Sequence, residues 1–256
     1  MIKYLFTLIV GVTTLISCKQ TDLHLLSDGK WRGEFSISDQ KFPFIFEVEN
    51  AVSDSAVVYL INGAERVPLK GSKYSGDSII IPIEAYDAVL TGVVSNDKFE
   101  GRFKKLYIDG DEGIPFVATK GDSLLFPIVN SANLNIFYTF ASTKGNGVLP
   151  YPTFNQEGAT LTGSVLTNAG DLRYLVGSTT ETGFQLAAFA GLSPYLIKIE
   201  SQDKDSFVGK FYTTRGATSL IGKRNPEASL VDPYSLAYMK DGYTKLDFTF
   251  PNIEGK

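Results

Sequence analysis

The chain has 256 residues, of which 43% are hydrophobic, with 24 Lys and Arg against 28 Asp and Glu. This composition supports a folded core and excludes an intrinsically disordered chain, and a net charge of −4 argues against a general nucleic-acid-binding surface. The single cysteine, Cys18, and the single histidine, His24, exclude an internal disulfide, a thiolate metal cluster and a multi-His metal site.

The first 18 residues have the pattern of a bacterial export signal. Lys3 precedes an apolar run over residues 5–12, which is too short to span a bilayer stably, and the segment ends in Leu15-Ile16-Ser17-Cys18. This ending resembles the lipobox of bacterial lipoproteins, in which the cysteine receives diacylglycerol and becomes the new N-terminus. The resemblance implies that Cys18 is lipidated and that the protein is anchored in the cell envelope, facing the periplasm, with the inner or outer membrane left open. An ordinary signal peptide with an incidental cysteine is the alternative.

Residues 19–28 are then expected to form a short tether, in which His24 has no functional role. From Gly29 onward, strand signals recur every 8–12 residues, and convincing helical periodicity is missing from the first half. Turn sequences such as Asn62-Gly63 and Asn96-Asp97 separate the strands. The strands expected in this half cover residues 31–38, 42–49, 56–61, 66–69, 78–83, 88–94, 99–106 and 114–118.

One strand pattern occurs twice. Phe99-Glu100-Gly101-Arg102-Phe103 returns as Phe-Val-Gly-Lys-Phe over residues 207–211. The alternation predicts a half-buried strand, and the central glycine indicates a close backbone contact or a bulge.

The repeat extends beyond this strand. An offset of about 106 residues also aligns several turn residues, so we interpret the body, 29–225, as two duplicated halves over about 29–121 and 133–225. The connector, 121–131, contains no long flexible linker. We therefore predict an all-β fold, an antiparallel meander of about 16 short strands in one large barrel or sandwich, with two subdomains side by side as the alternative.

Three short motifs are candidates for sites. Gly29-Lys30-Trp31 resembles the opening of lipocalins, where the tryptophan closes one end of a ligand-binding barrel, although a lone Trp in a β-protein is more often core packing.

The other two motifs carry charge. Residues 109–113, Asp-Gly-Asp-Glu-Gly, gather three carboxylates but lack EF-hand spacing, so a solvated hairpin tip is favoured over a cation site. Asp171 and Arg173 are expected to form a structural ion pair. We assign no catalytic, cofactor-binding or metal-binding residue, because no Ser elbow, phosphate loop or dinucleotide fingerprint is present.

The composition changes after Asn225. We expect a linker over 226–232, a short helix over 233–240 that begins at a proline, and an alternating strand from Leu246 that leads into a Pro turn and Gly-Lys. This segment, 226–256, resembles the entry to the redoxin domain of TlpA/ResA-type thioredoxin-fold proteins. Residues 29–34, 170–175 and 234–243 resemble the non-catalytic region that precedes that domain in lipid-anchored members.

The resemblance implies a thiol-disulfide oxidoreductase as the parent protein. Its Trp-Cys-x-x-Cys motif is expected beyond Lys256, so no active-site residue can be assigned to this chain, which is expected to end as the redoxin domain begins. The implied role is anchoring through Cys18 and docking of a periplasmic protein partner or substrate, without a cofactor. The alternative is a stand-alone lipoprotein whose lipocalin-like barrel binds a small apolar ligand.

Overall fold

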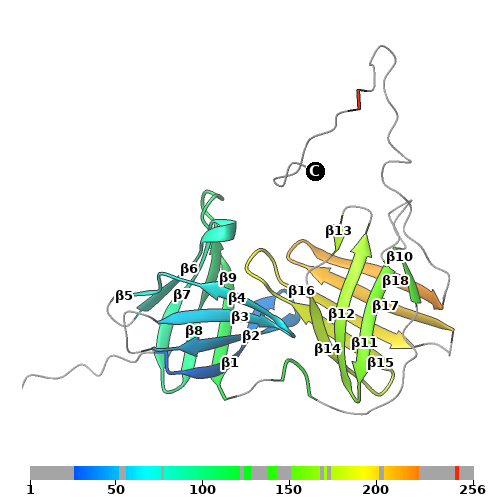
Figure 1. Cartoon of the computed structure of the whole chain (residues 1–256), viewed down its shortest axis with the longest axis horizontal. Helices are drawn as coiled ribbons and strands as arrows, with labels where there is room; N and C mark the ends of the chain where they lie inside the picture. Colours follow the sequence, from blue (N-terminus) through cyan, green and yellow to red (C-terminus); the bar gives the residue numbers. More distant parts are fainter. Residues whose placement is uncertain are drawn as a thin grey trace, which may run out of the picture.

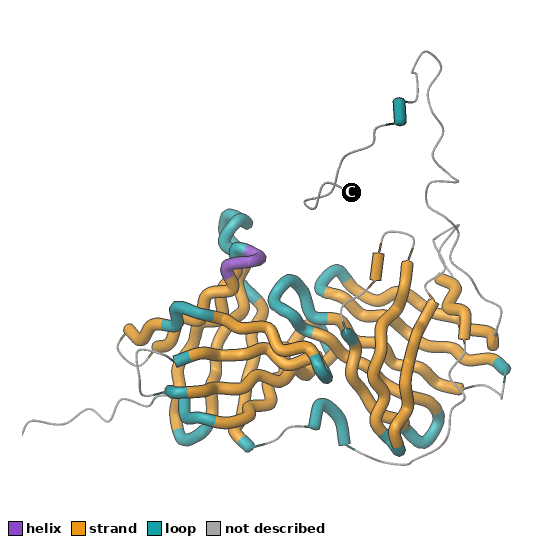
Figure 2. Tube along the Cα trace, viewed as in Figure 1, coloured by secondary structure: helices purple, strands orange, loops and turns teal. Residues whose placement is uncertain are grey.

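A computed structural model describes residues 26–51, 56–75, 78–121, 124–127, 138–142, 151–167, 170–171, 174–201, 205–224 and 246–247. Within these residues the fold is all-β and every strand pairing is antiparallel, as the sequence predicts. The strands form two sheets that lie side by side, one for each half of the chain (Figures 1 and 2).

We call the first sheet the first unit. It contains β1 (Gly29–Ile37), β2 (Gln40–Glu49), β3 (Val57–Asn62), β4 (Glu65–Leu69), β5 (Lys73–Ser75), β6 (Ser78–Ile83), β7 (Ala88–Ser95), β8 (Lys98–Lys105) and β9 (Ile114–Lys120), with a 3-10 turn, η1 (Glu84–Tyr86), after β6. The strand order is β4-β3-β2-β1-β9-β8-β7-β6-β5, so the first strand pairs with the last, and Trp31 lies opposite Lys120. The sheet curls into an open barrel whose two outer strands are β4 and β5 (Figure 2).

The second sheet, the second unit, has a similar plan. It contains β10 (Tyr138–Ser142), β11 (Tyr151–Glu157), β12 (Thr160–Thr167), β13 (Gly170–Asp171), β14 (Leu175–Thr179), β15 (Gly183–Ala188), β16 (Tyr195–Ser201), β17 (Ser206–Thr213) and β18 (Gly216–Arg224). The main order is β10-β18-β17-β16-β15-β14-β12-β11, with β13 paired to β12. Here too the first strand pairs with the last, while the outer strands are β10 and β11.

The division into two sheets decides between the two arrangements that the sequence allows. The antiparallel meander is confirmed, but it is divided into two sheets, over 29–120 and 138–224, and is not joined into one. Because β1 pairs with β9, and β10 with β18, the strands next to the connector already have hydrogen-bonding partners within their own halves. Strand β9 pairs with both β1 and β8, so it has no free edge from which the first sheet could continue into β10.

The repeated strands occupy matching positions, β8 in the first unit and β17 in the second. Gly101 lies opposite Gly92, and a Cβ on Gly101 would collide with the carbonyl oxygen of Thr91. A Cβ on Gly209 would collide with the carbonyl oxygen of Lys198. The predicted close backbone contact is confirmed, and the pairing continues without a bulge.

Most strands expected in the first half are found within one or two residues of their predicted bounds. The three-residue strand β5 was missed, because so short a segment gives too few residues for alternation to be recognised. The expected signal peptide, Cys18, His24, Arg173 and the C-terminal helix over 233–240 lie outside the described residues, as does the terminal strand apart from Leu246 and Asp247.

Candidate functional site

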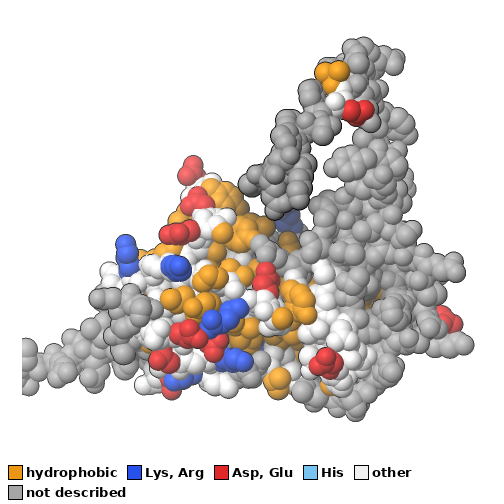
Figure 3. Space-filling view, in the orientation of Figure 1, with side chains coloured by type: hydrophobic (Ala, Val, Ile, Leu, Met, Phe, Trp, Pro, Cys, Tyr) orange, Lys and Arg blue, Asp and Glu red, His pale blue; other side chains and the backbone are white. Residues whose placement is uncertain are grey.

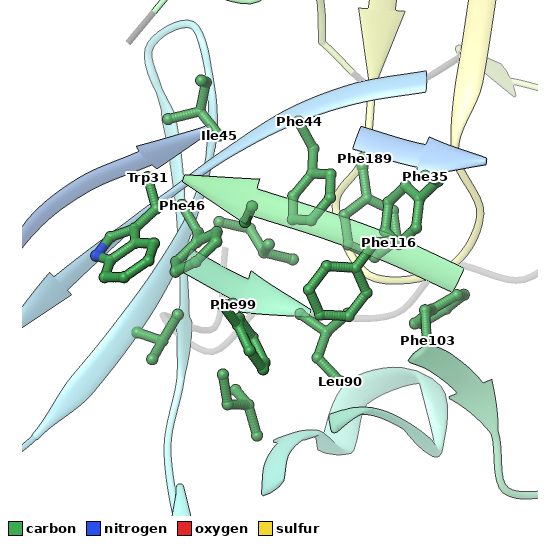
Figure 4. Packing of buried hydrophobic residues seen from close by; sticks show 14 of the residues in the cluster. Trp31, Phe35, Phe44, Ile45, Phe46, Leu90, Phe99, Phe103, Phe116 and Phe189 are labelled. Atoms are coloured by element: carbon green, nitrogen blue, oxygen red, sulfur yellow. The ribbon is translucent and has the colours of Figure 1, made fainter. Parts of the chain in front are cut away.

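The interior of the first unit is filled by aromatic rings. Buried residues alternate with more exposed ones along β1, β8 and β9, as expected for a curled sheet with one buried face. Strand β2 is buried on both faces over residues 42–46. The rings of these strands stack or meet edge to face, with centroids 4.4–6.3 Å apart (Figure 4). The rings of these four strands that contact one another belong to Trp31, Phe35, Phe44, Phe46, Phe99, Phe103 and Phe116.

One end of this core, which we call the Trp31 end, is closed by the chain just before β1. Leu26 is buried there, and its N–H donates to the Tyr74 hydroxyl at 2.9 Å. The Trp31 Nε1–H donates to the Ser27 carbonyl at 3.0 Å, and the Ala51 N–H donates to Asp28 Oδ1 at 2.8 Å. Residues 26–28 are therefore part of the folded unit, which shortens the tether expected over 19–28. Trp31 is a core residue at one end of the barrel, as either reading of its motif allows.

The opposite end, the Phe189 end, is closed by the second unit. Phe189 follows β15 and is 1% exposed. Its ring centroid lies 4.7 Å from that of Phe35, 5.1 Å from that of Phe103 and 5.4 Å from that of Phe44. Figure 4 shows the ring beside Phe35 and Phe44, far from Trp31. The second unit thus contributes a side chain to the core of the first.

The two-residue period of a β-strand explains how one hairpin serves two cores. Successive side chains of a strand point to opposite faces. Residues of β15, β16 and the start of their loop accordingly divide between the clusters. Ala187, Phe189 and Leu196 belong to the core of the first unit, while Leu186, Ala188 and Ile197 belong to that of the second.

Asn62 holds the loop that carries Phe189. Its Nδ2–H donates to the Phe189 carbonyl, and its Oδ1 accepts from the Phe189 N–H, both at 3.1 Å. Asn62 is 3% exposed, so these bonds satisfy backbone groups that water hardly reaches. The sequence assigns Asn62 to a turn with Gly63, and nothing in that pattern indicates a partner 127 residues away.

A solvent-exposed apolar tip lies at the Phe189 end. Leu106, Tyr107 and Ile108 follow β8 and are 60%, 56% and 46% exposed. The adjoining Lys105 Nζ donates to Ser193 Oγ in the loop after Phe189 at 3.3 Å. In Figure 3, apolar side chains gather at the top of the first unit below carboxylates. Three consecutive exposed apolar residues favour contact with another molecule.

Asp111, one of the three acidic residues beside this tip, has a structural role in the loop. Asp111 accepts hydrogen bonds from the N–H groups of Lys105 at 2.8 Å and Gly113 at 2.9 Å. The Lys105 bond is the main cause that lowers the pKa of Asp111 below its ordinary value. Among the residues that the structure describes, no three His, Cys, Asp or Glu side chains are grouped so that they could hold a metal ion.

A cavity of about 200 Å³ lies between the units. The outward-facing Ile45 and Ile61 of the first unit face Val176 of the second, and residues 124–126 of the connector line the cavity as well. Arg32 fixes this connector by donating to the carbonyls of Leu124 and Leu125, each at 2.9 Å. The contact between the units therefore includes the Phe189 ring inserted into the core of the first unit, the two hydrogen bonds of Asn62, and connector residues 124–126.

The exposed tip formed by Leu106, Tyr107 and Ile108 offers a surface on which another molecule can bind. The expected ion pair between Asp171 and Arg173 cannot be placed, because their side chains are outside the described part. No helix in the described part of the chain has the length and apolarity needed to cross a membrane. No protein-family model matches the chain, and no curated protein matches it.

Proposed function

We propose that this chain is the lipid-anchored, periplasm-facing β module of a TlpA-like thiol-disulfide oxidoreductase, and that it serves for anchoring and for docking a protein partner. The chain itself performs no catalysis in this proposal. The lipobox at Cys18 and the redoxin-like residues after 246 support it from the sequence.

The observation that carries the docking role is the exposed apolar tip, Leu106–Ile108, at the end of the first unit opposite Leu26 and Trp31. The folded body has begun by Leu26, eight residues after Cys18, and eight residues span at most about 28 Å. The anchor therefore holds the Trp31 end close to the bilayer. Strand β8 runs from that end to the tip, and its eight residues cover about 27 Å. The Leu106–Ile108 tip is thus presented away from the membrane, where a periplasmic protein can reach it.

The packing of the first unit favours docking over an internal ligand. A lipocalin-like ligand would occupy the barrel interior, but aromatic rings fill that space in the first unit. Leu26 and Trp31 close one end, and Phe189 closes the other. The exposed apolar tip supplies a binding surface that needs no internal cavity.

Three measurements test this proposal. Radiolabelled palmitate should be incorporated into the protein in cells, and C18S should abolish both the labelling and the membrane association. An in-frame Trp-Cys-x-x-Cys motif is expected in the gene downstream of Lys256. A photo-crosslinking amino acid at Tyr107 should capture a periplasmic protein that the same group at Val117, an exposed residue of β9, does not capture. A stop codon after Lys256 in a stable, abundant protein would contradict the oxidoreductase role, and identical crosslinks at both positions would contradict docking at the tip.

A further inference from the structure

The outer face of β16, β17 and β18 carries three rows of side chains that run across the strands. The pairing register places Lys198 opposite Lys210, and Lys210 opposite Ser219. These three side chains form the middle row, and each of them is a hydrogen-bond donor. Neighbouring strands lie about 4.8 Å apart, so the three donors stand close to one another on a surface that solvent reaches.

The two lysines are an unfavourable pair in the protein alone. Like charges directly opposite each other on neighbouring strands destabilise a sheet. Lys198 is held in place, because its Nζ donates to Gln40 Oε1 of the first unit at 2.8 Å. Within the described residues, Lys210 has no hydrogen-bond or ion-pair partner. A bound anion would relieve the repulsion and accept hydrogen bonds from both ammonium groups.

The rows on either side of the donors are mainly apolar. Val208 and Ile221 are paired on one side, and Ile221 is 43% exposed. Tyr212 lies on the other side, with its ring 6.0 Å from Lys198 Nζ. Together with the donor row they line a groove of about 510 Å³. Glu200 lines the groove at its β16 edge, beside Val208, and it repels an anion from that corner towards the lysines.

We propose that this groove is a binding site for an amphiphilic carboxylate. The carboxylate group lies between Lys198 Nζ and Lys210 Nζ and accepts a hydrogen bond from Ser219 Oγ, and the alkyl chain covers Val208 and Ile221. The site lies on the outer face of the second unit, beside its contact with the first, where Tyr212 packs against the core of the first unit and Lys198 bonds Gln40. It does not depend on the proposed docking role. Its size fits a medium-length chain, because ligand sites typically enclose 300–1,000 Å³.

The test uses the full chain and titrates it with decanoate, followed by NMR and by calorimetry. We expect one saturable site with shift changes centred on β16–β18. K210M, which keeps the apolar stem of the side chain, should weaken decanoate binding about tenfold or more. The matched control K70M, at an exposed lysine of the first unit, should leave the affinity unchanged.

Two further ligands separate the contributions of the two parts of the groove. Decanol lacks the charge and inorganic phosphate lacks the chain, so each should bind at least tenfold more weakly than decanoate. I221S should weaken decanoate binding and leave phosphate binding unchanged. Equal affinity for decanol, equal affinity for phosphate, or an unchanged decanoate affinity in K210M would each overturn the proposal. K210M should also keep or raise the melting temperature, because it removes the like-charge pair, so a loss of affinity will not reflect unfolding.

Discussion

Replacing Phe189 with Ala tests whether the loop of the second unit completes the core of the first. The side chain is 1% exposed and contacts the rings of Phe35, Phe44 and Phe103. Truncating a buried Phe to Ala costs about 3–5 kcal/mol, because burial is lost and a cavity remains. We expect about 4 kcal/mol here, since three aromatic contacts disappear at once.

The assay is urea denaturation followed by tryptophan fluorescence, because Trp31 is the single tryptophan and lies in the affected core. The urea midpoint should fall in F189A. The fluorescence transition should no longer coincide with the circular dichroism transition, because the first unit unfolds at lower urea than the second. L192A in the same loop is the control, and it should cost under about 0.5 kcal/mol because that side chain is 43% exposed and belongs to neither core cluster. If F189A lowers the free energy of unfolding by less than about 1 kcal/mol, the reasoning is refuted, because truncating a buried Phe costs about 3–5 kcal/mol.

Three other predictions concern local contacts. G101A should cost roughly 1–3 kcal/mol in chemical denaturation, because a methyl group forces the backbones of β7 and β8 apart, and a neutral result would contradict the close contact seen at Thr91. Burial raises the pKa of Tyr74, so the stability that its neutral hydroxyl provides is complete below pH 10 and is lost as the pH rises through the raised pKa. Melting temperatures at pH 8 and pH 11 should therefore differ less in Y74F than in the wild type, and an equal difference would argue against a buried hydroxyl. The pKa of Asp111 is lowered, so the stability that its carboxylate adds to the fold is present above about pH 4 and is lost as the pH falls through that pKa. D111A should thus melt earlier than the wild type at pH 6, with a gap that narrows by pH 3, and a gap independent of pH would point to another cause.

Local patterns predicted the strands of the first unit well. Alternation along Phe99-Glu100-Gly101-Arg102-Phe103 identified the buried face of β8, because a strand with one buried face must repeat its apolar residues every two positions. The repeated Phe-x-Gly-x-Phe segments identified equivalent strands and a close backbone contact, because only glycine leaves room there for the neighbouring strand. Lipidation at Cys18 and the redoxin-like end remain predictions.

The sequence by itself determined the class of fold and the buried face of the repeated strand, since both follow from residues a few positions apart. A comparison of the two halves at an offset of about 106 residues indicated the repeat. Only the tertiary structure decided that the halves form separate sheets, because the pairing of β1 with β9 joins segments about 90 residues apart, and alternation does not record which strand is the partner. It also decided that Asn62 holds Phe189 inside the first unit. Periodicity shows which face of a strand is buried, but it does not show which residues cover that face, because these residues come from distant parts of the chain.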